Sequence, residues 1–248
     1  MDRLMGLVRN HARRYRQLLE EQWEQTGWTH PQTQQVLRRM DQVLDQLPQA
    51  RKQARQRMLA DQPVANEEKV LSLYEPDVHV LVRNKAGAKV EFGNTLFLAE
   101  NSQGLILDWD LFQERAPSDC DLLPRSVGRM EQAYGPQLKA AAADRGFDSY
   151  SNRLGLANEG IYNGVCPRSP AQLQERVHSW KFKRLQRRRA QTEGRIAIVK
   201  NVFLGGRMRG KGFSHRQLTV TWTVLTHNLW VLARLQGAAM AAPQKQAA

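Results

Sequence analysis

Two acidic side chains are the candidates for chemistry, because their positions suit carboxylates that must meet at one site. Asp144 follows a short apolar run, residues 139–143, and precedes Arg145 and Gly146, so we expect it on a turn at the end of a buried strand. Glu193 is the only acid in residues 181–216. Carboxylates that converge from different elements can hold the pair of divalent cations used in phosphoryl transfer at nucleic acids. A plain turn or cap is the alternative for Asp144.

Glu193 falls on a helix that the sequence predicts from Trp180 to about Val202. At 3.6 residues per turn it shares one stripe with Phe182, Leu185, Ile196 and Lys200. We therefore expect this carboxylate to face the interior and the arginines on the other side of the helix to face solvent. A buried carboxylate needs a compensating charge, which a divalent cation would provide. A salt bridge to Arg189, one turn earlier, is the alternative.

The segment around Glu193 is also strongly basic, with twelve Lys and Arg residues in residues 181–216. The whole chain has 37 Lys and Arg against 24 Asp and Glu, a net charge of +13. Such a field attracts polyanions, of which nucleic acid is the usual one, although a solvated basic surface is the alternative. The residues expected to contact DNA phosphates are Arg184, Arg187, Arg188, Arg195, Lys200, Arg207, Arg209 and Lys211.

The elements that would position these residues alternate as in an α/β domain. From residue 90 onward the patterns predict a hairpin, a helix at 119–134, a strand at 139–143, a helix at 149–159, a strand at 162–167 and the basic helix. A further strand is expected at 78–82, and a final apolar helix at 214–235. This is the order of an RNase H-like core without its first strand. We assign the core to residues 68–236 and a disordered tail to 237–248.

Residues 1–67 predict an α-helical hairpin with no catalytic motif. Leu4, Val8, His11, Tyr15 and Leu18 repeat at intervals of three and four, which favours a helix that packs on a neighbour or, less well, a coiled coil. The Thr29–Gln32 segment has the pattern of a capping box, which begins the second helix. We expect these two helices to pack together.

The composition excludes several other classes of protein. No apolar run approaches the roughly 18 residues that a membrane-spanning helix needs, and the first residues lack the apolar stretch of a signal peptide. Cys120 and Cys166 are the only cysteines and have no metal-ligand spacing, so they predict reduced thiols in a cytoplasmic protein and no zinc site.

Several motifs together resemble one family. Residues 70–76 (VLSLYEP), 85–87 (KAG) and 90–93 (VEFG) are similar to the middle of ISNCY-type insertion-sequence transposases, within the wider DDE group. Asp144-Arg145-Gly146-Phe147 resembles that family's second-acid motif, and residues 192–196 (TEGRI) resemble its third-acid motif. Residues 226–229 (THNL) resemble its closing helix.

The resemblance implies an RNase H-like catalytic core, preceded here by the helical hairpin, that cleaves DNA and transfers strands with Mg²⁺ or Mn²⁺. Asp144 and Glu193 would be catalytic residues and metal ligands, and the partners would be transposon ends and target DNA. The protein would work in the bacterial cytoplasm, at the nucleoid, with no membrane partner and as a possible homo-oligomer. The family's first acid has no match, so we expect a truncated and inactive copy in which Glu75 or Asp77 could supply a third carboxylate.

Two other functions fit the same residues. The first is a non-catalytic DNA-binding protein derived from a transposase, which would use the basic helix while its metal site stays incomplete. The second is an RNase H-like nuclease that cuts DNA without joining it.

Overall fold

A computed structural model describes residues 2–82, 90–206, 208 and 210–241 of the 248-residue chain. The chain divides into two compact units, Met1–Asn94 and Thr95–Ala248. Helices and short strands alternate in it, which confirms a mixed α/β protein. Among the described residues no helix is long and apolar enough to cross a membrane.

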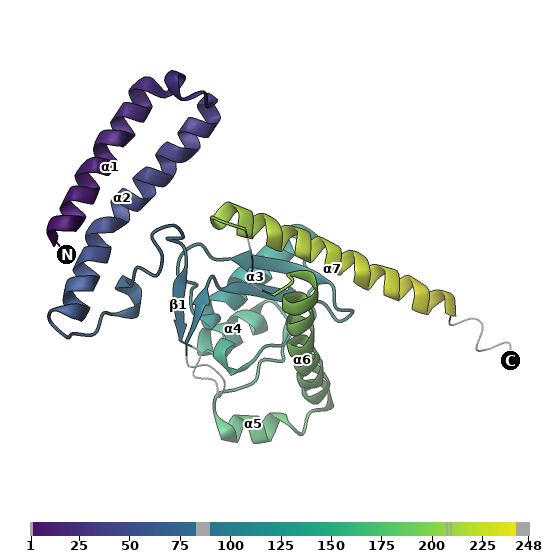
Figure 1. The fold of residues 1–248 in the computed structure, drawn as a ribbon. Coiled ribbons are helices and arrows are strands. Elements are labelled where there is room, and N and C mark those ends of the chain that lie inside the picture. The colour runs from purple at the N-terminus through teal and green to yellow at the C-terminus, as the bar shows by residue number, and fades with distance from the viewer. Residues whose placement is uncertain (1, 83–89, 207, 209, 242–248) are drawn as a thin grey trace. The chain divides into compact units, whose positions relative to one another are not determined.

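The Met1–Asn94 unit contains the predicted helical hairpin, α1 (Asp2–Gln22) and α2 (His30–Met58), drawn in purple and blue in Figure 1. The capping box is confirmed, because the Thr29 backbone N–H donates to Gln32 Oε1 over 2.8 Å. Arg16 of α1 forms an ion pair with Asp41 of α2. A two-stranded antiparallel sheet follows, made of β1 (His79–Val82) and β2 (Val90–Gly93).

The apolar stripe that the sequence analysis identified on α1 is mostly exposed, although a stripe of this kind was expected to pack on a neighbour. Leu4 is 66% exposed and Tyr15 is 61% exposed. The half-buried positions of α1 form a different face, which includes Met5, Arg9, Ala12, Arg16 and Leu19. The arginines on this face are long enough to cover apolar surface with their methylene groups while their charged ends meet acids or water.

The Thr95–Ala248 unit begins with the predicted hairpin, β3 (Leu96–Glu100) and β4 (Ile106–Leu111), which is antiparallel. The next elements are α3 (Asp119–Tyr134), β5 (Ala140–Ala141), α4 (Tyr150–Asn158), β6 (Tyr162–Asn163), α5 (Pro170–Arg176), α6 (Trp180–Ile198) and α7 (Phe213–Ala241). A five-residue π-helical turn, Val199–Phe203, extends α6. The prediction of strand, helix, strand and helix after α3 is confirmed, although β5 and β6 have only two residues each.

The strands of this unit form two separate pairs. β5 runs parallel to β6, with Ala140 opposite Tyr162, whereas among the described strands β3 pairs with β4 alone. An amide from α7 completes part of the β4 edge, because Asn228 Oδ1 accepts from the Ile106 N–H and Asn228 Nδ2 donates to the Ile106 carbonyl, each over 2.8 Å. A helix side chain thus pairs with backbone groups that a neighbouring strand would otherwise satisfy.

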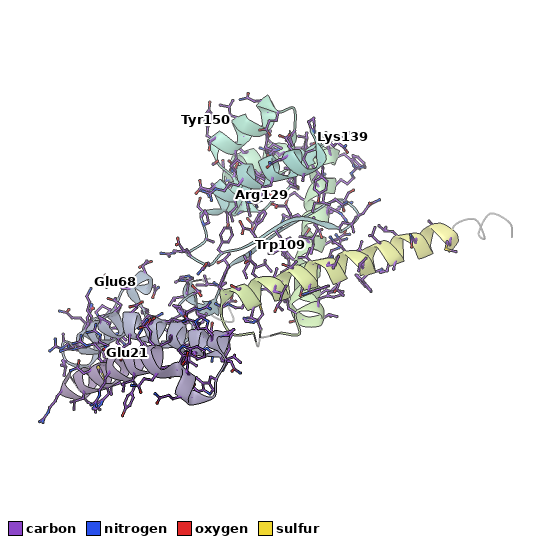
Figure 2. All side chains as sticks on the ribbon, turned by 90° about the horizontal axis from the view of Figure 1, so that it is seen from above. Glu21, Glu68, Trp109, Arg129, Lys139 and Tyr150 are labelled. Carbon is purple, nitrogen blue, oxygen red and sulfur yellow. The ribbon has the colours of Figure 1, made fainter. Side chains whose placement is uncertain are left out.

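Each strand pair packs into its own apolar cluster. The cluster beside β3 and β4 consists of Ile106, Leu111, Val199, Val220 and Val224. The cluster beside β5 and β6 consists of Leu123, Val127, Leu156, Ile161 and Val165. α3 connects the two regions, because its Leu123 and Val127 lie in the second cluster while its Arg129 binds Asp108 of β4 through two hydrogen bonds of 2.8 Å (Figure 2).

The C-terminal helix is longer than expected. The tail was predicted to be disordered from residue 237, but α7 continues to Ala241. The run Ala238-Ala239-Met240-Ala241 has high helix propensity, and it follows a helix that is already formed, so it extends the helix without a new nucleation step. Residues 242–248 of the predicted tail lie outside the described residues.

Candidate functional site

Asp144 lies where the sequence placed it, just after β5. It caps the short 3-10 turn Arg145–Phe147, and its Oδ1 accepts a hydrogen bond from the Gly146 N–H over 2.9 Å. The side chain is exposed to solvent. An acid at the end of a strand, followed by a tight turn, holds its carboxylate at the edge of the fold, where a ligand can reach it. The turn therefore orients Asp144 without burying it.

A second carboxylate, Asp119, lies beside this turn. A Cβ atom built on Gly146 would be 2.3 Å from Asp119 Oδ2 and 3.1 Å from Asp144 Oδ1. The distance between Asp119 Oδ2 and Asp144 Oδ1 is therefore at most the sum of these two distances. The sequence indicated only that Asp119 begins a helix, because an acid in the first turn of α3 is fully explained by the helix dipole. Its proximity to Asp144 has no signature in residue spacing.

Glu193 does not face the interior, and this prediction was wrong. Its side chain is 69% exposed, and its Oε1 lies 3.0 Å from Arg189 Nη1, which is the salt bridge considered as the alternative. The buried side of α6 and its extension passes instead through Phe182, Leu185, Thr192 and Val199. Glu193 lies next to that face. The prediction failed because a helical stripe only one residue wide does not determine which of two neighbouring rows of side chains is buried.

The buried acid near α6 is Glu100, at the end of β3, which the sequence analysis did not single out. It is 10% exposed, and its Oε1 accepts from Arg195 Nη1 over 2.6 Å and from Thr192 Oγ1 over 2.7 Å. Arg188 Nη2 donates to the Asn101 carbonyl over 3.4 Å. Burial lowers the pKa of Arg188, and the charge of Arg195 lowers it further, whereas Glu100 raises it.

These contacts divide the predicted DNA-contacting residues into two groups. Arg188 and Arg195 hold the β3–β4 hairpin against α6, so the expectation that they face away from the protein was wrong. Arg184, Arg187, Lys200 and Lys211 are exposed. Arg207 and Arg209 lie outside the described residues.

The exposed side of α6 combines cations with aromatic rings. The Arg184 guanidinium lies 5.0 Å from the centre of the Trp180 ring, and Trp180 is itself 69% exposed. Lys181 Nζ lies 4.1 Å from the centre of the Tyr162 ring. Cations that rest on aromatic faces keep their charge accessible to phosphate. This face, with Arg187 beside Arg184, has the chemistry of a polyanion-binding surface.

A divalent-metal site is only partly supported by these residues. Asp144 and Glu193 both offer solvent-facing carboxylate oxygens, which suit Mg²⁺ or Mn²⁺. Within the described ranges, however, no three His, Cys, Asp or Glu side chains form a group that could hold a metal ion. Glu75 and Asp77, the other candidates for a third ligand, belong to the Met1–Asn94 unit.

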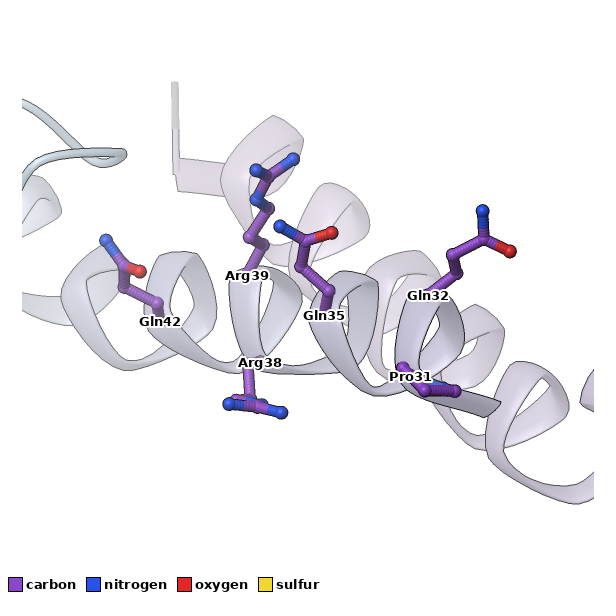
Figure 3. A pocket seen from close by; sticks show the side chains of 6 residues that line it. All are labelled: Pro31, Gln32, Gln35, Arg38, Arg39 and Gln42. Atoms are coloured by element: carbon purple, nitrogen blue, oxygen red, sulfur yellow. The ribbon is translucent and has the colours of Figure 1, made fainter. Parts of the chain in front are cut away.

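A shallow hollow lies on α2. Its lining side chains are those of Pro31, Gln32, Gln35, Arg38, Arg39 and Gln42, shown in Figure 3. In that view Arg38 and Arg39 point to different sides of the helix. The lining contains no carboxylate, thiol, hydroxyl or imidazole, so it offers no group for metal binding or nucleophilic catalysis.

Comparison with known proteins identifies a family for this part of the chain. Residues 84–229, more than half of the chain, match the family model described as a transposase DDE domain. The match covers β2 through α6, a range that contains both Asp144 and Glu193, and ends at Leu229 of α7. No curated protein and no solved structure matches the chain at a significant level.

Proposed function

Because the chain belongs to the DDE transposase family, we propose that it is an RNase H-like transposase domain that binds DNA along the exposed face of α6. The observation that carries this proposal is the grouping of Lys181, Lys183, Arg184 and Arg187 on the solvent side of a helix inside the family match. Arginines and lysines on such a face neutralise phosphates and position DNA without reading its sequence.

The order of elements supports the RNase H-like assignment. A hairpin, β3–β4, precedes α3, β5, α4, β6 and α6, and the pair β5–β6 is parallel, as expected for strands linked by a helix. In this assignment the first strand of the core has no counterpart among the described strands of the Thr95–Ala248 unit. Asp144 then lies at the end of the fourth strand, and Glu193 lies on the last core helix.

We assign Asp144 and Glu193 as the second and third acids of the family. Such acids would hold Mg²⁺ or Mn²⁺, and the bound cations would supply the positive charge that stabilises the phosphoryl-transfer transition state. In this chain the two residues would each offer carboxylate oxygens, Asp144 from its turn and Glu193 after release from Arg189. Two acids alone cannot hold a pair of cations and leave room for the scissile phosphate, so the 248-residue chain should bind DNA without cutting it.

DNA binding is tested by measuring affinity for a random-sequence duplex over a range of salt concentrations. If ~5 phosphates are neutralised, the logarithm of the binding constant should fall with that of salt at a slope of about −4.5. Replacing Arg184 and Arg187 with Ala should reduce the slope by about 1.8. We choose Arg187 over Arg188 because Arg188 binds the Asn101 carbonyl.

The matched control replaces Arg13 and Arg14 of α1, two adjacent exposed arginines, with Ala. Both double variants remove two positive charges, so a general effect of net charge would change the slope equally. A larger change for the α6 variant locates the interface there. Equal changes, or no salt dependence in the native chain, would contradict the proposal.

A non-catalytic DNA-binding role is the second candidate, favoured by the lack of a three-acid group among the described residues. It predicts that Asp144→Asn and Glu193→Gln leave DNA affinity unchanged both with and without Mg²⁺. If the acids bind metal beside the DNA, Mg²⁺ should strengthen binding of the native chain more than that of the two variants. Affinity measurements in Mg²⁺ and in a metal chelator therefore separate the two functions without requiring cleavage.

A further inference from the structure

A hollow between α1 and α2 gathers four positively charged side chains. The two helices lie side by side in the hairpin (Figure 1), and the hollow between them has a volume of about 310 Å³. Such a volume is near the lower limit for small-molecule sites. Arg9 of α1 lines it together with Arg51, Lys52 and Arg55 of α2, and the described lining contains no Asp or Glu. Cations gathered in this way favour a negatively charged ligand.

The helical spacing explains both the grouping of the cations and the open space beside them. Arg55 is three positions from Lys52 and four from Arg51, so the three side chains lie on one side of α2. Gly6 of α1 lies three positions before Arg9 and also lines the hollow, and a Cβ atom built on it would meet nothing within 4 Å. A glycine inside a helix costs about 0.5–1 kcal/mol relative to alanine. At this position it leaves the hollow open.

Arg9 has a hydrogen-bond donor that the protein does not satisfy. Its Nε is buried, and it has no hydrogen-bond partner among the described residues. Arg51 and Arg55 already interact with other groups of the chain. Lys52 Nζ lies 3.7 Å from Glu68 Oε2, but both side chains are largely exposed, so this pair contributes little and can open. A buried donor without a partner destabilises the fold unless a bound molecule accepts from it.

The cations indicate a ligand with more than one phosphate group. The planar fork of a guanidinium donates two parallel hydrogen bonds to phosphate oxygens, which gives such pairs both strength and a defined geometry. Three guanidiniums and one ammonium carry four positive charges, whereas one phosphate group carries at most about two negative charges at neutral pH. Met5 and Leu47 are half-buried in the same lining and offer apolar contacts to an uncharged part of a ligand.

We propose that the hollow between α1 and α2 binds a small polyphosphate, either free or as the triphosphate group of a nucleotide. Arg9 donates from Nε and Nη to one phosphate group, and Arg51, Lys52 and Arg55 neutralise the others. The ligand joins α1 to α2, because its cations come from both helices. The site requires neither DNA on α6 nor a divalent metal, so it does not depend on the function proposed above.

Isothermal titration calorimetry of the full chain with inorganic tripolyphosphate, without divalent metal, tests this site. The native chain should bind about one equivalent with a micromolar dissociation constant. Arg9→Met should raise that constant by about tenfold or more, because a charged hydrogen-bond donor is lost. Arg13→Met is the matched control, since Arg13 is an exposed arginine one turn further along α1. It removes the same charge and should raise the constant by less than about twofold.

Gly6→Leu separates binding in the hollow from a general effect of net charge. The leucine side chain fills the open space while every cation stays in place, so the dissociation constant should again rise by about tenfold or more. Leucine favours the helical conformation, so α1 should remain folded, which circular dichroism checks. Gly128→Leu in α3 is the control, because Gly128 also has open space around it, and it should leave the constant unchanged.

Adenosine triphosphate and a short DNA duplex identify the source of the phosphates. Adenosine triphosphate that binds at least as tightly as tripolyphosphate, with the same response to Arg9→Met, indicates a nucleotide, and weaker binding indicates free polyphosphate. A native chain that does not bind tripolyphosphate saturably, or equal losses for Arg9→Met and Arg13→Met, would overturn the proposal. An equal loss of DNA and tripolyphosphate affinity in Gly6→Leu would also overturn it, because the hollow would then bind DNA phosphates.

Discussion

Replacing Glu100 with Gln should destabilise the protein far more than replacing Glu193 with Gln. Both acids lie near α6 and each forms an ion pair with an arginine of that helix. They differ in burial, because the Glu100 side chain is 10% exposed and the Glu193 side chain is 69% exposed. Gln keeps an oxygen that can accept from Thr192 at position 100, so the substitution removes mainly the charge.

The expected magnitudes follow from this difference. Removing one partner of a buried ion pair costs about 3–5 kcal/mol, because the other charge is left uncompensated. Arg195 remains 25% exposed and can recover some hydration, so we expect a loss of about 2–4 kcal/mol for Glu100→Gln. The loss should be larger than for an isolated pair, since Arg188 and Arg195 repel each other once Glu100 is neutral. Glu193→Gln removes an exposed pair between neighbouring turns, which is worth about 0.3–0.5 kcal/mol.

Urea unfolding followed by circular dichroism measures both free energies. With a denaturant slope of about 2–3 kcal/mol/M, the midpoint for Glu100→Gln should fall by about 1 M urea. The midpoint for Glu193→Gln should stay within about 0.2 M of the native value. Combining Glu100→Gln with Arg195→Gln should restore part of the loss, since the double change leaves fewer unpaired charges. A larger loss for Glu193→Gln than for Glu100→Gln would refute this account of the two carboxylates.

Two further predictions concern the turn after β6 and the chemistry of the chain. Gly164→Ala should lower the free energy of unfolding in urea by about 1–3 kcal/mol, because the new Cβ would lie 2.8 Å from a backbone carbonyl oxygen of β5. Gly155→Ala is the control, because the space around Gly155 in α4 is open, and it should raise the free energy of unfolding by about 0.5–1 kcal/mol. Equal effects of the two substitutions would contradict the close contact at Gly164. The native chain should leave transposon-end DNA uncut in Mg²⁺ or Mn²⁺. If the native chain cleaves this DNA and Asp144→Ala abolishes the cleavage, a third carboxylate takes part in the reaction. Asp119, which lies beside Asp144, and then Glu75 and Asp77 are the first residues to replace.

Element order was predictable from sequence because each element carries a local signal. The helix at Asp119–Tyr134 was predicted with its observed bounds, and the turn at Asp144 followed from an apolar run that ends in Asp-Arg-Gly. The capping box at Thr29 is equally local, because its partners are three residues apart. Such features depend on neighbours along the chain and do not require knowledge of the tertiary fold.

The orientation of side chains on α6 could not be predicted, because it depends on contacts between distant segments. The helical wheel placed Glu193 inside with Phe182, but the β3–β4 hairpin packs where Arg195 can reach Glu100, a residue 95 positions earlier in the sequence. A stripe drawn from apolar residues alone omits an arginine whose partner is a buried acid. The same limit applies to α1, where the apolar stripe that includes Leu4 and Tyr15 is exposed and the packing face includes Arg9 and Arg16.

The two long helices of the Thr95–Ala248 unit therefore have different roles, and both follow from charge. α6 uses Arg188 and Arg195 to bind the hairpin and presents Arg184 and Arg187 to solvent, where we propose that DNA binds. α7 uses its valines and Asn228 to bind the same hairpin and presents an uncharged apolar row.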